Sequence, residues 1–200
     1  KLLPESVYII GPDQSTCYSW NYLSTIAKHN YCMLVGDDAQ FLSKHWDQHI
    51  VDFFETYKHK DKILYVCPRD MTPKDKRRWE KYNLPTDKPY KIKTHPSPVG
   101  AAHFVLHKNW INTVGYFLPP QFWHWHIDNY LTKIAVQLGR AYVLPYVQIQ
   151  SKKIMDDHTG KRIRTEMNIW YRDRDVWRRT NGRYLTADIE ALQNFIKNYN

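Results

Sequence analysis

Two adjacent carboxylates, Asp37 and Asp38, follow an apolar run from Cys32 to Val35. Turn-prone Asn30 and Gly36 bound the run, which predicts a strand buried on both faces with the carboxylates at its carboxyl end. In open α/β sheets, ligands bind at that edge. Because neighbouring carboxylates repel each other unless a cation lies close, the pair indicates a Mg²⁺ or Mn²⁺ site. A solvated polar turn is the alternative, and the dipeptide alone favours neither.

A second group of reactive side chains lies between Gln121 and Tyr130, where three aromatic rings, two imidazoles and one carboxylate occur together. An apolar stripe of helical period begins at Ile127, and Gly139 predicts the end of that helix. Asp128 therefore falls in the first helical turn, where the helix dipole stabilises a carboxylate. Without other information, a helix-start charge beside an aromatic core is the simpler interpretation.

The carboxyl-terminal part of the chain offers two further candidates. His158 follows Asp156 and Asp157, and both residue types coordinate Mn²⁺, although a polar turn explains them equally well. From Lys161 to Arg183, arginines alternate with aromatic residues. A guanidinium-rich segment of this kind can fold over phosphates.

Alternating strands and helices must position these side chains. Strands are predicted over residues 7–10, 32–35 and 63–66, around 90–93, at the end of the segment 99–106, and over 141–149. Three helices are predicted to begin after the amino-terminal caps Ser19, Ser43 and Thr186, and a fourth has Pro73 at its first position. Two more are predicted, one over 109–115 and one that ends at Gly139. The first βαβ unit brings Gln14 and Asn21 to the edge that carries Asp37 and Asp38. Ala101 and His103 precede a strand and could floor a pocket, or the small residue could only permit tight packing.

Composition narrows the class of protein. The chain has 200 residues, is 42% hydrophobic and carries a net charge of +9, which suits one globular domain with a basic surface attractive to phosphate. Three widely spaced cysteines favour neither a disulfide framework nor a zinc cluster. No apolar run approaches the roughly 20 residues that span a bilayer, and no signal peptide is visible. A soluble, cytoplasmic protein without a membrane span is expected.

The order of the predicted strands and helices resembles that of nucleotide-sugar glycosyltransferases of the GT-A fold. The match is best to the family-two-like inverting enzymes of phages and large DNA viruses. The resemblance covers residues 7–150. It is carried by Gly11–Asn21, by Leu34–Phe41 with Trp46-Asp47, and by Gly100–Phe104, Asn112–Phe117 and His126–Asn129. It implies one α/β domain over residues 1–200 with a mostly parallel, Rossmann-like central sheet flanked by helices, a smaller acceptor-side β region and a C-terminal helix. Residues 1–66 would form the nucleotide-binding half, 90–150 the acceptor and catalytic half, and 151–200 a basic closing segment.

The resemblance also implies roles for individual residues. Asp128 would be the general base of an inverting hexosyltransferase, which moves a sugar from a nucleotide-diphosphate donor, expected to be a UDP-sugar, to a glycan or glycoprotein hydroxyl. The expected donor contacts are Gln14, Asn21, Asp37, Asp38, Ala101 and His103. The expected acceptor contacts are Trp123, Trp125 and His126. The expected ligands of Mn²⁺ or Mg²⁺ are Asp37, Asp38 and His158.

Two departures from the family pattern stand out. Such enzymes usually begin with an additional strand and helix that carry part of the base pocket, and the chain starts at Lys1 without a methionine. The family also often has a histidine after the last strand, where Gln150 and Ser151 stand in this chain. If the protein is viral, as the resemblance implies, it would be located in the cytoplasm of the host cell.

Two other classes of protein compete with this interpretation. A nucleic-acid-binding or metal-dependent nuclease domain would use the basic aromatic tail, but Ala39-Gln40-Phe41 lacks the carboxylate and lysine that a two-metal nuclease needs after Asp38. Nucleic acid is therefore disfavoured as a partner. A carbohydrate-binding module would use the eight tryptophans, but such modules are usually all-β, whereas helical stripes are evident.

Overall fold

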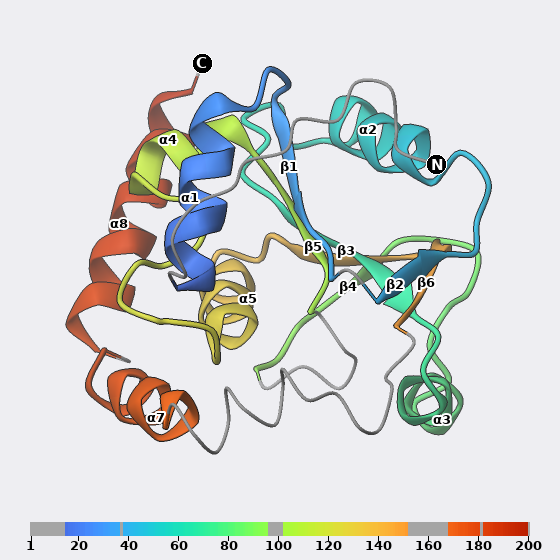
Figure 1. Cartoon of the computed structure of the whole chain (residues 1–200). Coiled ribbons are helices and arrows are strands. Elements are labelled where there is room, and N and C mark those ends of the chain that lie inside the picture. Colours follow the sequence, from blue (N-terminus) through green and yellow to red (C-terminus); the bar gives the residue numbers. More distant parts are fainter. Residues whose placement is uncertain (1–14, 37, 96–101, 152–167, 181, 200) are drawn as a thin grey trace.

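The computed structural model describes residues 15–36, 38–95, 102–151, 168–180 and 182–199, and the predicted strand over 7–10 lies outside them. The described residues form a mixed α/β structure (Figure 1). Its strands are β1 (Tyr31–Leu34), β2 (Ala39–Phe41), β3 (Tyr65–Asp70), β4 (Tyr90–Lys91), β5 (Phe104–His107) and β6 (Ala141–Ser151). Its helices are α1 (Thr16–Ile26), α2 (Trp46–Thr56), α3 (Pro73–Lys81), α4 (Lys108–Val114), α5 (Ile127–Gln137), α7 (Ile169–Thr180) and α8 (Arg183–Asn198).

One curled, mixed sheet joins all six described strands in the order β1-β5-β3-β6-β2, with β4 also paired to β6. The pair β3–β6 is parallel, with Val66 opposite Tyr142, and the other described pairs are antiparallel. The prediction of a mostly parallel sheet is therefore wrong for the described strands. Hydrophobic runs indicate that a strand is buried, but they carry no information about its direction.

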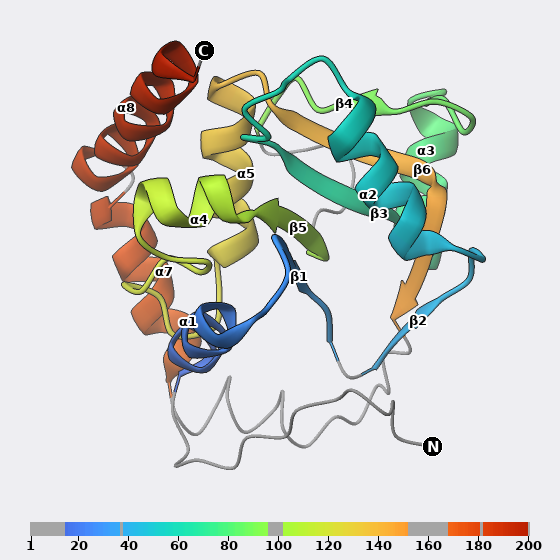
Figure 2. The same cartoon turned by 90° about the horizontal axis from the view of Figure 1, so that it is seen from above.

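The two faces of the sheet are covered by different helices, because successive side chains of a strand point to opposite faces. On β3, Tyr65 and Cys67 pack into a core with α4, α5 and α8. Val66 points the other way, into a second core that includes Phe53 of α2. Figures 1 and 2 show α2 on one side of the sheet, and α5, α4 and α8 on the other.

Strand β1 corrects one expectation about the sheet. A strand buried on both faces was predicted over 32–35, yet only Cys32 among the residues of β1 is buried, and the other three are half-buried. β1 is the last strand on its side of the described sheet, so it has one described neighbour, β5. The three cysteines, all in the described part, are buried and form no disulfide, so they are core residues.

Several helix ends differ from the predicted caps. Ser15, not Ser19, caps α1, because its Oγ accepts a hydrogen bond from the backbone N–H of Tyr18. Ser43 does not cap α2: its hydroxyl donates to the Tyr146 carbonyl and accepts from Gln148 N–H, and so ties this loop to β6.

Other helix ends are confirmed or shifted. α8 starts at Arg183, so Thr186 lies within it rather than capping it. Pro73 at the start of α3 and Gly139 after α5, with a φ of 67°, agree with the prediction. None of the described helices is long and apolar enough to cross a membrane.

Candidate functional site

The turn between β1 and β2 holds the described half of the carboxylate pair. Asp38 is exposed, and Asp37 lies outside the described residues. The Ala39 N–H donates to the Gly36 carbonyl at 3.2 Å, which closes the turn. A Cβ at Gly36 would stand 2.7 Å from Oδ1 of Asp38, so glycine is needed for this position of the carboxylate. The sequence pattern thus specifies a tight turn that presents Asp38 to solvent.

His103 and Ser151 join this turn at the same edge of the sheet. β2 pairs with the end of β6, which sets Ala39 opposite Ser151 and Gln40 opposite Gln150. His103 immediately precedes β5, and its Nε2 lies 2.9 Å from Oγ of Ser151. The carboxyl ends of β1 and β6 and the amino end of β5 therefore bring a carboxylate, an imidazole and a hydroxyl to one place.

Asp70, at the carboxyl end of β3, adds a second carboxyl group to this edge. Burial raises its pKa, while the Thr72 N–H, at 2.9 Å from Oδ1, and nearby His103 act in the opposite direction. Sequence reasoning missed Asp70, because the predicted strand ends at residue 66. Instead β3 continues past Pro68 with a shift in register.

The predicted metal ligands are only partly placed. Asp38 is described, whereas Asp37 and His158 are not. Within the described ranges, no group of three or more His, Cys, Asp or Glu side chains could hold a metal ion. The described residues therefore do not by themselves form a cation site, and the metal stays a prediction.

The loop before α5 is held by a buried carboxylate on α7. Asp173 is fully buried, and its Oδ1 accepts the Trp123 N–H at 2.9 Å. Its Oδ2 accepts the N–H groups of His124 and Trp125 at 2.7 and 2.8 Å. Three successive backbone donors on one carboxylate fix the course of this loop.

Two more contacts hold the same loop. Oγ1 of Thr16, at the start of α1, lies 2.7 Å from Nδ1 of His124. The guanidinium of Arg172 stands over the Trp123 ring, 5.0 Å from its centre. Elements far apart in the sequence therefore position Trp123 and Trp125.

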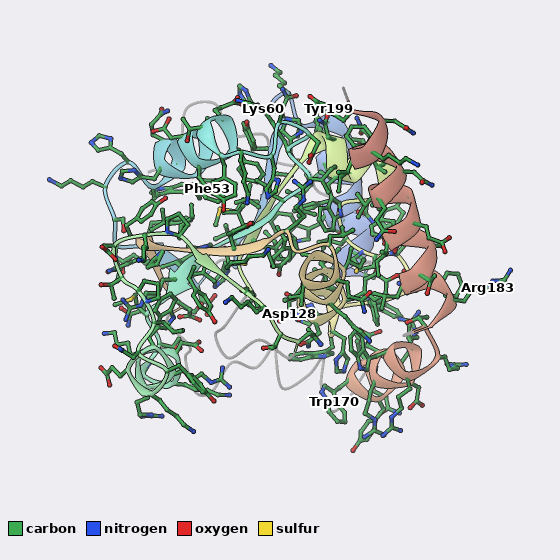
Figure 3. The ribbon with its side chains drawn as sticks, turned by 180° about the vertical axis from the view of Figure 1, so that it is seen from behind. Phe53, Lys60, Asp128, Trp170, Arg183 and Tyr199 are labelled. Atoms are coloured by element: carbon green, nitrogen blue, oxygen red, sulfur yellow. The ribbon has the colours of Figure 1, made fainter. Side chains whose placement is uncertain are left out.

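Asp128 lies directly after this loop, in the first turn of α5. Burial raises the pKa of its carboxyl group, and the Asn129 N–H and neighbouring His126 offset only part of that effect. A carboxylate of raised pKa is a stronger base than an ordinary aspartate. Figure 3 shows Asp128 beside α5, near the middle of that view, and in Figure 2 the start of α5 faces the same side as the end of β1.

Trp177 of α7 completes the surroundings of Asp128. Its ring stacks on the His126 ring, with 5.8 Å between the ring centres and 15° between the ring planes. The centre of the His95 ring lies 5.9 Å from that of Trp177. The buried Nε2 atoms of both histidines find no hydrogen-bond partner among the described residues. Both imidazoles lie close enough to Asp128 to be influenced by its charge.

A search of protein-family models found no match to this chain, and a search of curated proteins found none either.

The predicted donor contacts are scattered. Gln14 and Ala101 lie outside the described residues. The Asn21 side chain is occupied by the backbone: its Nδ2 donates to the Leu118 carbonyl at 2.7 Å, and its Oδ1 accepts the N–H groups of Phe117 and Leu118 at 2.8 and 2.7 Å. In this arrangement Asn21 joins α1 to the segment after α4, and a donor contact from it stays a prediction.

Sequence reasoning missed Asp173, Trp177 and His95 as parts of the site. A signal for the first two was present, since Ile169, Asp173, Val176, Trp177 and Thr180 follow a helical period. A carboxylate on the inner stripe of a helix needs buried donors, and the three backbone N–H groups of the loop before α5 supply them.

Proposed function

We propose that this chain is a metal-dependent inverting glycosyltransferase that moves a sugar from a nucleotide-diphosphate donor, a UDP-sugar in our proposal, to a hydroxyl group of a glycan or glycoprotein. The observation that carries the proposal is the position of Asp128. It is a half-buried residue whose carboxyl group has a raised pKa, and it directly follows a rigidly held, aromatic loop. Asp38, His103 and Ser151 gather at the edge of the sheet toward which the start of α5 faces.

Asp128 would act as the general base. Its carboxylate takes the proton of the acceptor hydroxyl while that oxygen forms a bond to the anomeric carbon. The bond between the anomeric carbon and the phosphate oxygen breaks, and its electron pair leaves with the nucleoside diphosphate. Attack opposite the leaving group inverts the configuration at the carbon.

The loop before Asp128 would bind the acceptor. Trp123, Trp125 and His126 are each partly exposed, and aromatic faces pack well against the C–H faces of sugars. Asp173 keeps the backbone of this loop in place, which limits the ordering that the loop must undergo when an acceptor binds.

The donor would lie toward Asp38 and His103. A Mn²⁺ or Mg²⁺ ion bound there would neutralise the leaving diphosphate. Of the three predicted ligands, Asp38 is the one among the described residues that would hold the ion.

The test compares Asp128→Asn with Asp47→Asn. Asp47 also lies in the first turn of a helix, α2, but it is exposed and is not one of the predicted site residues. The assay follows release of the nucleoside diphosphate from a panel of nucleotide sugars in the presence of mixed glycans, and donor binding is measured by calorimetry. We expect Asp128→Asn to lose transfer by a factor of about 100 or more while binding the donor normally. Asp47→Asn should behave as the wild type.

Two results would count against this function. Normal transfer by Asp128→Asn would remove its role as base, and weakened donor binding would move Asp128 to a structural or donor-binding role. Tight binding of a single-stranded oligonucleotide, without any turnover of nucleotide sugars, would favour the nucleic-acid alternative.

A further inference from the structure

Two hollows flank α4 on the side of the molecule away from α2. One, of about 710 Å³, lies between α1 and α4 and is lined by Tyr18 and Tyr22, among others. The other, of about 560 Å³, lies between α4 and α8 and is lined by Asn194 and Tyr199, among others. Both include Asn112, so they meet on α4. Figures 1 and 2 agree that α4 lies between α1 and α8.

Exposed aromatic rings occur at both ends of this double groove. Tyr18 and Tyr22 are 59% and 50% exposed, and Tyr199 is 42% exposed. Tyr18 and Tyr22 are four residues apart on α1, so their rings share one face of the helix. A tyrosine ring combines an apolar face with a polar tip, which matches the mixed surface of a sugar.

Side-chain amides fill the space between these rings. Asn112 on α4 and Asn194 and Asn198 on α8 are exposed and line the groove. The positions of Asn194 and Asn198, four residues apart, place both amides on one face of α8. Each amide offers two N–H donors and an acceptor oxygen, the complement of a sugar hydroxyl.

The groove carries little charge, although the chain as a whole is strongly basic. Lys108 is the one charged residue among the described lining residues, and its Nζ donates to the Ala27 carbonyl at 2.6 Å. A nucleic acid or acidic glycan would find no array of free cations here. The lining therefore favours a neutral ligand with many hydroxyl groups.

We propose that the groove across α1, α4 and α8 is a second carbohydrate site, which binds a neutral oligosaccharide. The sugar rings lie against Tyr18, Tyr22 and Tyr199, and the amides of Asn112 and Asn194 hydrogen-bond their hydroxyl groups. The site goes beyond the proposed transferase function, because it includes neither Asp128 nor Asp38. It would hold a glycan chain away from the reacting group.

The test titrates the chain with neutral linear tetrasaccharides of glucose, mannose and N-acetylglucosamine, with ligand-observed NMR and calorimetry as readouts. Tyr22→Ala and Asn112→Ala remove a ring and an amide. Tyr184→Ala is the matched control, because Tyr184 is 62% exposed on α8 but lies outside the groove lining. Trp123→Ala removes a predicted acceptor contact, and so separates the groove from the proposed acceptor site.

At least one neutral tetrasaccharide should bind, and Tyr22→Ala and Asn112→Ala should each weaken it about fivefold or more. Tyr184→Ala and Trp123→Ala should leave binding unchanged. The proposal is overturned if no neutral tetrasaccharide binds at millimolar concentration, or if binding survives both groove substitutions. It is also overturned if Trp123→Ala abolishes binding, or if sedimentation shows that the groove instead joins two copies of the chain. None of these results changes the transfer assay, so the two proposals fail independently.

Discussion

Replacing Asp173 should loosen the loop before α5 and destabilise the whole fold. Its carboxylate is fully buried and accepts three backbone N–H groups, from Trp123, His124 and Trp125. Asp173→Ala leaves three donors without this acceptor, each costing about 1–3 kcal/mol if it stays buried. Because the loop can relax toward water, we expect about 3–5 kcal/mol in total. At about 2–4 °C per kcal/mol for a chain of this size, Tm should fall by about 6–20 °C.

The asparagine variant makes the prediction more specific. Two of the three donors share Oδ2, and the third bonds to Oδ1. Asp173→Asn can keep its oxygen at the Oδ2 position and lose only the bond from Trp123, whose N–H would then face an amide N–H₂. The loss should be about 1–3 kcal/mol, smaller than for alanine.

The assay is thermal unfolding, with amide hydrogen exchange of residues 123–125 as the local readout. Asp175→Asn on the same helix is the control, since Asp175 is exposed and its ion pair with Arg178 spans 3.8 Å. Such a surface pair contributes about 0–1 kcal/mol. If Asp173→Ala melted within 2 °C of Asp175→Asn, with unchanged exchange in the loop, the assigned role of the carboxylate would be refuted.

Three further changes test other contacts. Asn21→Ala should lower the unfolding free energy by about 2–4 kcal/mol, because the backbone at 117–118 loses all three of its bonds to this side chain. Burial lowers the pKa of His59 to about 4, so stability should fall as pH drops from about 6.5 towards 4, and His59→Gln should flatten that fall. Arg140→Lys should cost about 1–2 kcal/mol, because its two bonds to Asp61 need a planar guanidinium. Denaturant unfolding measures all three.

Each of these expectations has a definite contrary result. If Asn21→Ala unfolded at the same denaturant midpoint as the wild type, the Asn21 amide would not be needed for stability. Its role as a donor contact would then gain support. Asp70 and Asp188 have carboxyl groups of raised pKa, and their effect on stability is opposite to that of His59. They make the free energy of unfolding fall as pH rises. An unchanged pH slope in His59→Gln would therefore place the acid sensitivity elsewhere. A fully stable Arg140→Lys would show that the second bond is unimportant.

Local signals in the sequence predicted individual elements well. Pro73 marked the start of α3, Gly115 and Gly139 marked the ends of α4 and α5, and the apolar run over 141–149 lies within β6. Each of these signals acts within a few residues, through a fixed φ or a repeating pattern. It can therefore be recognised in the sequence without knowledge of the tertiary structure.

Properties that depend on distant partners were not predictable. The direction of β5 against β1 and β3 is absent from its pattern, so the sheet was expected to be mostly parallel. Ser43 has the chemistry of a cap, but β6 offers its hydroxyl better-placed partners. Asp173 binds a loop some 50 residues earlier in the chain, and no local rule connects the two.

The central claim is that this chain binds a nucleotide sugar at the edge of the sheet that carries Asp38. Calorimetric titration with UDP, with and without Mn²⁺, tests it most directly, with Asp38→Asn as the variant and exposed Asp47→Asn as the control. We predict that Mn²⁺ tightens UDP binding, that Asp38→Asn removes this gain, and that Asp47→Asn retains it. Absence of a Mn²⁺ effect on UDP, together with tight binding of a single-stranded oligonucleotide, would contradict the account.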